Sequence, residues 1–374
     1  MDKFIRWAFV VFVVAIISLM GFKFFAKPDT PQASANQSAT TPAKTAVKPK
    51  FKIAWSIYAG WMPWDYANKK GIIQKWADKY NLDIEIVQVN DYIQSINQYT
   101  SGDFAGVTIT NMDALTIAAA GGVDSTAVIV GDYSNGNDGI LLKNGHSVAD
   151  LKGKKVNLVE YSVSHDLLSR ALEKNNLSLK DVTTVNSADA NLASAFSSND
   201  VPAIVTWNPI LDVAKKQKDA HLIFSSKDIP GEILDLLLIN TQVLKQNPDL
   251  GKALTGAWYE TLSVMQGNDE SAKAARAFMA EAAGTDLPSF ETQLASTYFF
   301  NDSRSAAAFF DQKQLLPVME RVETFAFDNH LLGDKAKDNK YIGIETPEGI
   351  WGDPNNVKLR FNRNFTDESA QGKL

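Results

Sequence analysis

Short apolar runs alternate with stretches of helical periodicity from residue 51 onward. The segment 150–172, DLKGKKVNLVEYSVSHDLLSRAL, shows this unit most plainly: an apolar run at 156–159, a Ser-rich turn, and then apolar side chains at helical spacing. A strand that ends in a small polar turn at a helix N-terminus leaves free backbone N–H groups at its rim, which is where small ligands bind in open α/β sheets. A comparable unit at 103–122 predicts two α/β lobes that face one ligand.

The same patterns predict the other elements. Gly71 is expected to interrupt the first helix, and Gly121-Gly122 to end the third. Because strands alternate with helices, we expect parallel sheets with right-handed crossovers. The expected strands are 51–57, 82–89, 105–109, 125–130, 139–142, 156–159, 182–185, 203–206, 221–224 and 234–239, and the expected helices are 65–80, 91–100, 111–120, 164–175 and 188–196, with 241–331 mostly helical.

This order of elements predicts a discontinuous first lobe with a second lobe inserted into it. Hinges are expected near 139–143 and 238–241, where the chain passes between the lobes. The polar C-terminal segment is expected to wrap around the surface. The domain boundaries that follow are 51–139 together with 240–333 for lobe 1, 140–239 for lobe 2, and 334–374 for the C-terminal extension.

The N-terminus has the pattern of a targeting segment. Lys3 and Arg6 precede an uncharged apolar run at 7–22, which is shorter than the about 20 residues of a spanning helix and suits a signal peptide. Residues 1–26 are therefore expected to be a signal peptide or a transmembrane anchor retained in the inner membrane. Residues 27–50 are rich in Pro, Ala, Thr, Ser and Gln and predict a disordered linker. In both cases we expect the bulk of the chain in the periplasm or cell envelope.

Composition narrows the classes of function. The net charge of −6 and the lack of Lys/Arg clusters argue against a nucleic-acid partner. The chain has no cysteine, which excludes disulfides, zinc-thiolate sites and thiol catalysis, and its 4 histidines share no metal-ligand spacing. No nucleotide-binding, GxSxG or HExxH motif occurs. We therefore expect no enzyme, no catalytic residues, no metal and no cofactor.

Several sequence blocks resemble, in order, the nitrate/taurine type of ABC-importer solute-binding protein over about residues 51–331. They are KIAWSIYAGWMPWDYANKKGII, GDFAGVTITNMDALTIAAAGG, DLKGKKVNLVEYSVSHDLLSRALEK, VPAIVTWNP and IPGEILDLLLIN. The Trp-rich first turn resembles, more narrowly, the subgroup associated with urea carboxylase systems. The resemblance implies a two-lobed periplasmic-binding-protein fold (type II) whose inter-lobe cleft closes over a ligand. It also implies delivery to ABC permease and ATPase subunits, and a role in nitrogen uptake with urea or guanidinium as ligand.

Aromatic residues are the first candidates for ligand contact. Tyr58, Trp61 and Trp64 crowd the first turn, and Trp207 ends a predicted strand. Flat rings suit a planar ligand and attract a cation by about 0.5–2 kcal/mol. The alternative for each of them, and for Trp55, is packing in the core.

Polar candidates lie at the predicted turns. Each has an alternative as a helix cap, a rim residue or a solvated turn residue. The candidates are Asn111, Asp113, Ser162 and His165 at helix starts, Glu160 after a strand, and the carboxylates Asp138, Glu232 and Asp235.

Charge separates the candidate ligands. Asp113 and Glu160 at helix N-terminal turns would repel nitrate or a sulfonate, whereas a guanidinium pairs with carboxylates through charged hydrogen bonds. Guanidinium is therefore favoured and urea comes next, because a neutral ligand leaves a dry carboxylate uncompensated. A nitrate, sulfonate or other small-solute binding protein, and a membrane-tethered sensor, remain as alternatives. An enzyme resembling the pyrimidine synthases of thiamine biosynthesis is disfavoured, because those enzymes rely on a Cys-rich motif.

Overall fold

The computed structural model describes residues 47–374. The expected signal or anchor segment and almost all of the expected linker lie outside the described residues. Within the described part, no helix combines the length and the apolar character needed to cross a membrane.

The first lobe is built on a nine-stranded sheet with the order β13-β12-β14-β4-β10-β3-β1-β2, and β11 pairs with β4. Strands β1, β2 and β3 are parallel, as expected, but β10 runs antiparallel to both β3 and β4. The strands are β1 (Lys50–Trp55), β2 (Asp83–Gln88), β3 (Gly106–Thr110), β4 (Ser125–Ser134), β10 (Leu234–Asn240), β11 (Thr297–Phe299), β12 (Gly343–Thr346), β13 (Gly349–Trp351) and β14 (Val357–Phe361).

The second lobe is built on a five-stranded sheet with the order β7-β6-β8-β5-β9. Strand β5 is antiparallel to its neighbours β8 and β9, whereas β6 is parallel to β7 and β8. The expectation of wholly parallel sheets is therefore wrong for both lobes, because β10 and β5, the strands that the chain enters after each crossing, run antiparallel to both of their neighbours. The strands are β5 (Asp138–Lys143), β6 (Lys155–Leu158), β7 (Thr183–Asn186), β8 (Ala203–Trp207) and β9 (Ala220–Ser225).

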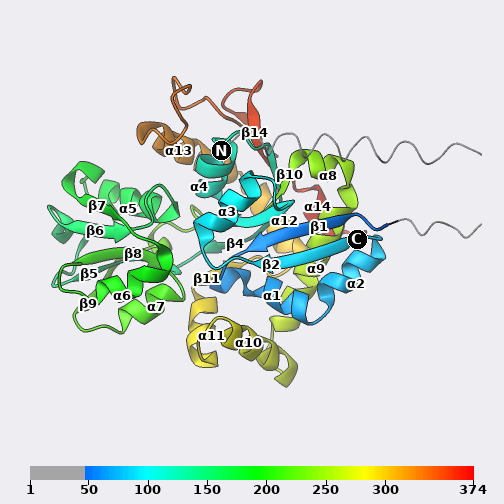
Figure 1. Ribbon diagram of the computed structural model, residues 1–374, viewed down its shortest axis with the longest axis horizontal. Coiled ribbons are helices and arrows are strands. Elements are labelled where there is room, and N and C mark those ends of the chain that lie inside the picture. Colours follow the sequence, from blue (N-terminus) through cyan, green and yellow to red (C-terminus); the bar gives the residue numbers. More distant parts are fainter. Residues whose placement is uncertain (1–46) are drawn as a thin grey trace, which may run out of the picture. The chain divides into compact units, whose positions relative to one another are not determined.

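Helices accompany each sheet, and Figure 1 shows α5, α6 and α7 grouped with the green strands of the second lobe. The helix expected at 65–80 is interrupted at Gly71 as predicted: α1 and α2 lie on either side of it, and Gly71 adopts a left-handed φ of 77°. The helices are α1 (Met62–Lys69), α2 (Ile72–Lys79), α3 (Tyr92–Thr100), α4 (Asn111–Asp113, continued by a π-helical turn at Ala114–Ala119), α5 (Val163–Lys174), α6 (Leu192–Phe196), α7 (Ile210–Lys215), α8 (Thr241–Gln246), α9 (Pro248–Met265), α10 (Glu270–Ala282), α11 (Leu287–Ala295), α12 (Ser303–Asp311), α13 (Leu315–Asp328) and α14 (Asn364–Ala370).

The C-terminal segment is part of the first lobe. Strand β14 lies between β12 and β4, with Leu359 and Phe361 buried and paired in register with Ser125 and Ala127. The expectation that this segment wraps the surface is wrong, because its apolar side chains alternate with polar ones and cover the edge of the large sheet.

Two crossings join the lobes, one between β4 and β5 and one between β9 and β10. Asn111 clamps the second crossing: its Nδ2 donates to the Glu232 carbonyl (3.1 Å), and its Oδ1 accepts from the Leu234 N–H (2.9 Å). Asn137 ties the first crossing to the second lobe, because its Oδ1 accepts a hydrogen bond from Asn208 Nδ2 (2.7 Å). Buried amide side chains thus hold both crossings in place. The residues that flank the crossings are therefore held close to the space between the two sheets.

Candidate functional site

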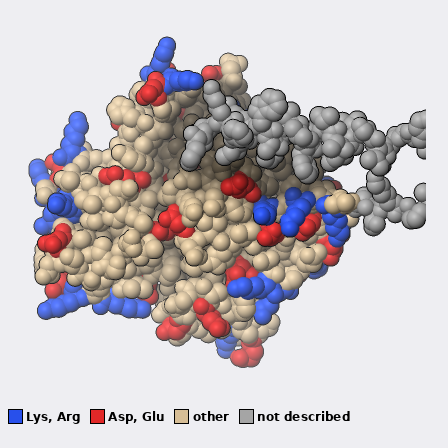
Figure 2. Space-filling view, in the orientation of Figure 1, with Lys and Arg blue, Asp and Glu red and all other residues tan. Residues whose placement is uncertain are grey.

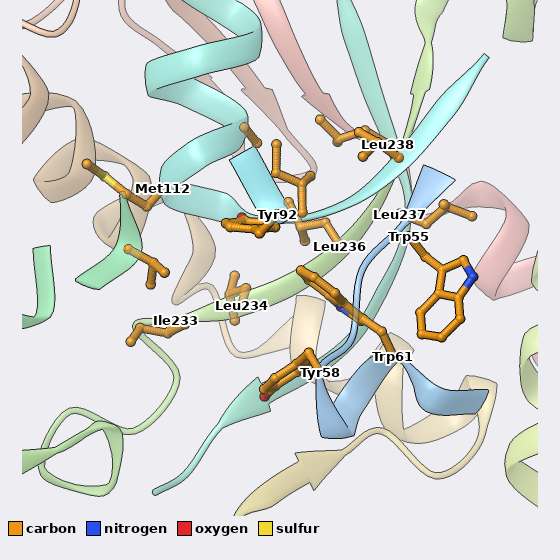
Figure 3. Close-up of a cluster of buried hydrophobic side chains, with 14 of the residues drawn as sticks. Trp55, Tyr58, Trp61, Tyr92, Met112, Ile233, Leu234, Leu236, Leu237 and Leu238 are labelled. Atoms are coloured by element: carbon orange, nitrogen blue, oxygen red, sulfur yellow. The ribbon is translucent and has the colours of Figure 1, made fainter. Parts of the chain in front are cut away.

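A small cavity lies where residues of both lobes meet. Its empty volume is ≈ 280 Å³, and its walls come from α3, β3, β10 and the first turn on one side and from β5, β8 and α5 on the other. Figure 3 shows Tyr58, Trp61 and Tyr92 close together beside Ile233, at the end of the second crossing, and Leu234, the first residue of β10. The lining residues are Tyr58, Trp61, Tyr92, Thr110, Asp138, Val163, Ile233, Asp235 and Trp207, and we call this cavity the outer pocket.

Four aromatic rings, each in contact with the next, frame the outer pocket. Tyr58 meets Trp61 edge-on at 5.1 Å, Trp61 lies tilted against Tyr92 at 5.6 Å, and Tyr92 meets Trp207 edge-on at 5.7 Å between ring centroids. The last contact passes from α3 of the first lobe to the end of β8 in the second. A planar ligand in this space is therefore surrounded by ring edges and faces, the geometry that suits a flat or cationic group.

Tyr92 is held in place by Asp113. The Tyr92 hydroxyl donates to Asp113 Oδ2 (2.7 Å), and the Thr110 hydroxyl, which also caps the helix, donates to the same oxygen (2.9 Å). The Val163 N–H of the second lobe lies 3.4 Å from that oxygen as well. Burial raises the pKa of Asp113 to about 6 despite these three donors. Asp113 therefore positions an aromatic wall and joins the lobes, and it is not itself a lining residue.

Two carboxylates line the outer pocket directly. Asp138 accepts a hydrogen bond from the Ser134 hydroxyl (2.5 Å), and burial raises its pKa to about 7. Asp235 lies beside the Tyr58 hydroxyl, and burial together with the nearby Asp132 raises the pKa of Asp235 well above its ordinary value. None of the nine lining residues is Lys, Arg or His. The pocket is therefore acidic and aromatic, and it carries no positive group of its own.

Asp132 stands opposite Asp235 in the antiparallel ladder of β4 and β10. It is fully buried, and no donor group of the described residues reaches its carboxylate oxygens, whose only hydrogen-bond neighbour is the carboxyl of Asp235. Sequence reasoning missed Asp132 and Tyr92. Asp132 had one usable signal, a carboxylate directly after the apolar run of β4, but the strand was expected to end at Val130. Tyr92 had none, because a tyrosine at a helix start reads as ordinary packing.

Of the ten candidate ligand residues, four line the outer pocket. They are Tyr58, Trp61, Trp207 and Asp235. Trp64 lies behind them, stacked on Trp258 at 5.0 Å between ring centroids. Asn111 is occupied with the second crossing, as described above. Trp55, for which core packing was the alternative, is buried on β1 and lines no part of the pocket.

The structure does not bring the remaining candidates to the outer pocket. Glu160 accepts from the Thr184 hydroxyl and lines a separate open groove that also includes Asn97 and Asn186. Ser162 caps α5, with its Oγ accepting from the Ser164 N–H (3.2 Å). His165 accepts from the Tyr161 N–H through Nδ1 (3.1 Å), and burial lowers the pKa of its ring. The polar side chains of the turn after β6 are thus occupied by local hydrogen bonds. The position of a residue at a strand end does not by itself determine which way its side chain points.

On the face that Figure 2 shows, the surface charge favours neither a cationic nor an anionic ligand. Residues of both signs are interspersed there among the described residues. In residues 47–374, no group of three or more His, Cys, Asp or Glu side chains is arranged to hold a metal ion.

Comparison with known proteins gives a family and a fold. A family model described as NMT1/THI5 like matches residues 66–272. A curated relative from Brucella abortus (strain 2308), whose name describes it only as a binding protein, is 27% identical over 161 residues, which is 42% of this chain and 50% of the relative. The chain thus spans about half the length of the curated relatives it matches first. A relative from Escherichia coli (strain K12), named for binding aliphatic sulfonates, is 34% identical over 83 residues, 22% of this chain and 26% of the relative.

Solved structures resemble the chain over most of its length. The alkanesulfonate-binding protein from Xanthomonas axonopodis pv. citri superimposes with a TM-score of 0.62 at 18% identity, covering 77% of this chain and 96% of that one. The periplasmic nitrate-binding protein from Synechocystis PCC 6803 gives a TM-score of 0.62 at 12% identity, covering 87% and 89%. At such identities the likeness shows the fold alone. The fold is that of periplasmic binding proteins, as the sequence predicted.

Proposed function

Because the chain belongs to the NMT1/THI5-like family, we propose that it is the periplasmic solute-binding component of an ABC importer. In this proposal it captures a small planar nitrogen-rich solute, guanidinium first and urea next, and delivers it to permease and ATPase subunits. The fold supports the class of protein, since two lobes joined by two crossings can close over one small ligand.

One observation carries the choice of ligand. Asp138 and Asp235 line an aromatic pocket in which no Lys, Arg or His is a lining residue. A carboxylate removed from water is costly unless a cation or several donors meet it. Guanidinium supplies both its positive charge and flat N–H edges, and each charged hydrogen bond contributes about 1.5–3 kcal/mol. The small volume also favours a ligand of few atoms.

A sulfonate or nitrate ligand is the second candidate, because the relatives are named for such anions. An anion would face Asp138 and Asp235 with no lysine or arginine among the lining residues to offset them. Urea gains ground at lower pH, where burial keeps these carboxyls protonated and able to donate. The ranking of ligands is therefore expected to depend on pH.

Calorimetry with the purified full chain at pH 8 tests the proposal. We expect guanidinium to bind most tightly, urea more weakly, and nitrate and taurine least. Asp138→Asn keeps the hydrogen bond from Ser134 and removes the charge, so it should weaken guanidinium about 10- to 100-fold and urea much less. Glu160→Gln, outside the outer pocket, is the matched control and should leave both affinities unchanged. Tight nitrate or taurine binding, or equal losses for guanidinium and urea, would contradict the charge argument.

A further inference from the structure

A second, smaller chamber lies directly behind the outer pocket. Its empty volume is ≈ 190 Å³, and the indoles of Trp64 and Trp258 and the carboxylate of Asp132 contribute to its walls. Trp61 and Asp235 line both cavities. They therefore form the partition between the outer pocket and this space, which we call the inner chamber.

Asp132 is the unexplained group in the inner chamber. It is 0% exposed, and no donor group in residues 47–374 reaches either of its carboxylate oxygens; the only side chain within hydrogen-bond reach is the carboxyl of Asp235. A Cβ at Gly60 would come within 3.0 Å of Asp132 Oδ2, so the backbone of the first turn closes tightly over the carboxylate. The indole N–H groups of Trp61 and Trp258 are also buried without partners. Polar atoms in this number, buried and unsatisfied, are the exception in folded proteins and call for a partner.

The charged surroundings of Asp132 are all acidic. Asp235 faces it from β10, Asp138 acts on it from β5, and the Tyr58 hydroxyl lies near the pair from the first turn. No Lys, Arg or His lines either cavity. A buried carboxylate with only acidic neighbours either keeps a proton or is met by a cation. The pair Asp132 and Asp235 can share one proton when no cation is near, since two like charges so close cannot both ionise cheaply.

We propose that the inner chamber is a subsite for one unsubstituted –NH₂ arm of the cationic ligand, with Asp132 as the acceptor at its far end. The inference rests on the proposed function and extends it. The arm enters past the partition of Trp61 and Asp235, lies between indole rings, and donates to Asp132 and Asp235. The other arms stay in the outer pocket, where Asp138 accepts from them. As the cation arrives, the proton shared by the Asp132–Asp235 pair leaves to solvent, so that positive charge is exchanged for positive charge.

The size of the chamber fixes what can enter it. Most of its empty volume lies too close to the wall atoms to hold another atom, so it leaves room for little more than one water-sized group. An –NH₂ or –NH₃⁺ group fits, whereas a methylated arm does not. The enclosing side chains are rigid, because Trp64 is stacked on Trp258 and Trp258 packs against Gly131, where a Cβ would approach its ring to 2.7 Å. Specificity for an unsubstituted arm therefore follows from a wall that cannot yield easily.

The test compares the full chain with Asp132→Asn by calorimetry, titrating guanidinium at pH 6.5 in two buffers of different ionisation enthalpy. We expect the wild-type chain to release protons on binding, and Asp132→Asn to bind at least 10-fold more weakly with a smaller proton release. A merely structural role for Asp132 would alter thermal stability and leave the proton count unchanged. Wild-type affinity and wild-type proton release in Asp132→Asn would overturn the inference.

A second variant, Asp138→Asn, tests the inference if Asp132→Asn does not fold. Asp138→Asn removes only the outer carboxylate, so its residual guanidinium binding should still release protons from the Asp132–Asp235 pair. Binding without proton release in Asp138→Asn would overturn the inner subsite. If the wild-type chain binds nitrate or taurine and no cation, both the proposed function and the subsite fail. Cation binding with an unchanged Asp132→Asn removes the subsite alone.

Discussion

Four buried aspartates at or beside the two cavities have raised pKa values, which makes the stability of the protein depend on pH. Asp113, Asp132, Asp138 and Asp235 are each at most 4% exposed, and burial is the largest cause of the raised pKa of each. In the unfolded chain the same groups have pKa values near 3.9. The folded chain thus binds more protons than the unfolded chain between about pH 4 and 7. Their contribution to stability is fully present at low pH and is lost as pH rises through the folded pKa values.

We therefore expect the ligand-free protein to lose thermal stability as pH rises from about 5 to 8. One pKa unit corresponds to about 1.4 kcal/mol, so Asp138 alone can account for at most about 4 kcal/mol. His165 acts in the opposite sense: burial lowers its pKa, so its contribution is lost as pH falls below its unfolded value near 6.5. Calorimetric melting across this range measures the slope, and Asp132→Asn should flatten it. A melting temperature that rises with pH would contradict the assignment.

The aromatic part of the site could be predicted from the sequence, and its acidic part only partly. Tyr58, Trp61 and Trp207 were proposed as large rings in a turn or at a strand end, and all three line the outer pocket. Glu160 lines a separate groove instead, because a residue that follows a strand can point to either side of the sheet. Asp132 was missed because Gly131 before it reads as a turn signal, whereas the strand needs a glycine there to pass the Trp258 ring.

At the level of elements, the order of strands and helices followed from periodicity, while pairing direction and strand length did not. Strand β10 pairs antiparallel with both β3 and β4, and no local pattern specifies which neighbours a buried strand will have. The C-terminal strands were missed for a related reason. In β14, two buried side chains among polar ones resemble a loop until a sheet edge is present to receive them.

The role of β14 predicts a strong effect for a substitution far from the pocket. Leu359 is 0% exposed and pairs with Ser125 on β4, so Leu359→Ala should lower the free energy of unfolding by about 2–5 kcal/mol. Chemical denaturation measures the loss. Lys358→Ala, at the preceding and more exposed position, is the control and should change stability by less than about 0.5 kcal/mol. Equal small effects would mean that β14 is dispensable to the large sheet.

At the scale of the whole described molecule, the two lobes meet through three kinds of contact. Tyr92 packs on Trp207, the Val163 N–H points at Asp113, and Arg321 on α13 pairs with Asp166 on α5 at 3.2 Å. Arg321 also pairs with Glu232 in the second crossing at 3.0 Å. The ionic contacts thus lie beside the second crossing, and moving the lobes apart would break the pair of Arg321 with Asp166.

Small-angle scattering can follow this closure. Saturating ligand should reduce the radius of gyration of the wild-type chain if its lobes are apart without ligand. If the ionic contacts already hold the lobes together, the wild-type radius should be small with and without ligand. Arg321→Ala removes the pairs with Asp166 and Glu232, so without ligand its radius should exceed that of the wild type. Lys252→Ala is the control, because the ion pair of Lys252 with Asp249 stays within α9. Identical radii for all variants with and without ligand would argue against hinge closure.

The position of β14 also bears on the order in which the protein can be made. The central strands β4 and β10 have the first strands of the chain on one side and its last strands on the other. A chain that emerges with its N-terminus first can therefore build the second lobe early, from one continuous segment. The first lobe has to wait for residues 357–361, which are made long after β4, and the part of β4 at 125–127 has no partner on that side until then. An open strand edge is the feature by which unfinished chains join one another, so we expect the first lobe to be most prone to aggregation in the interval before β14 is made.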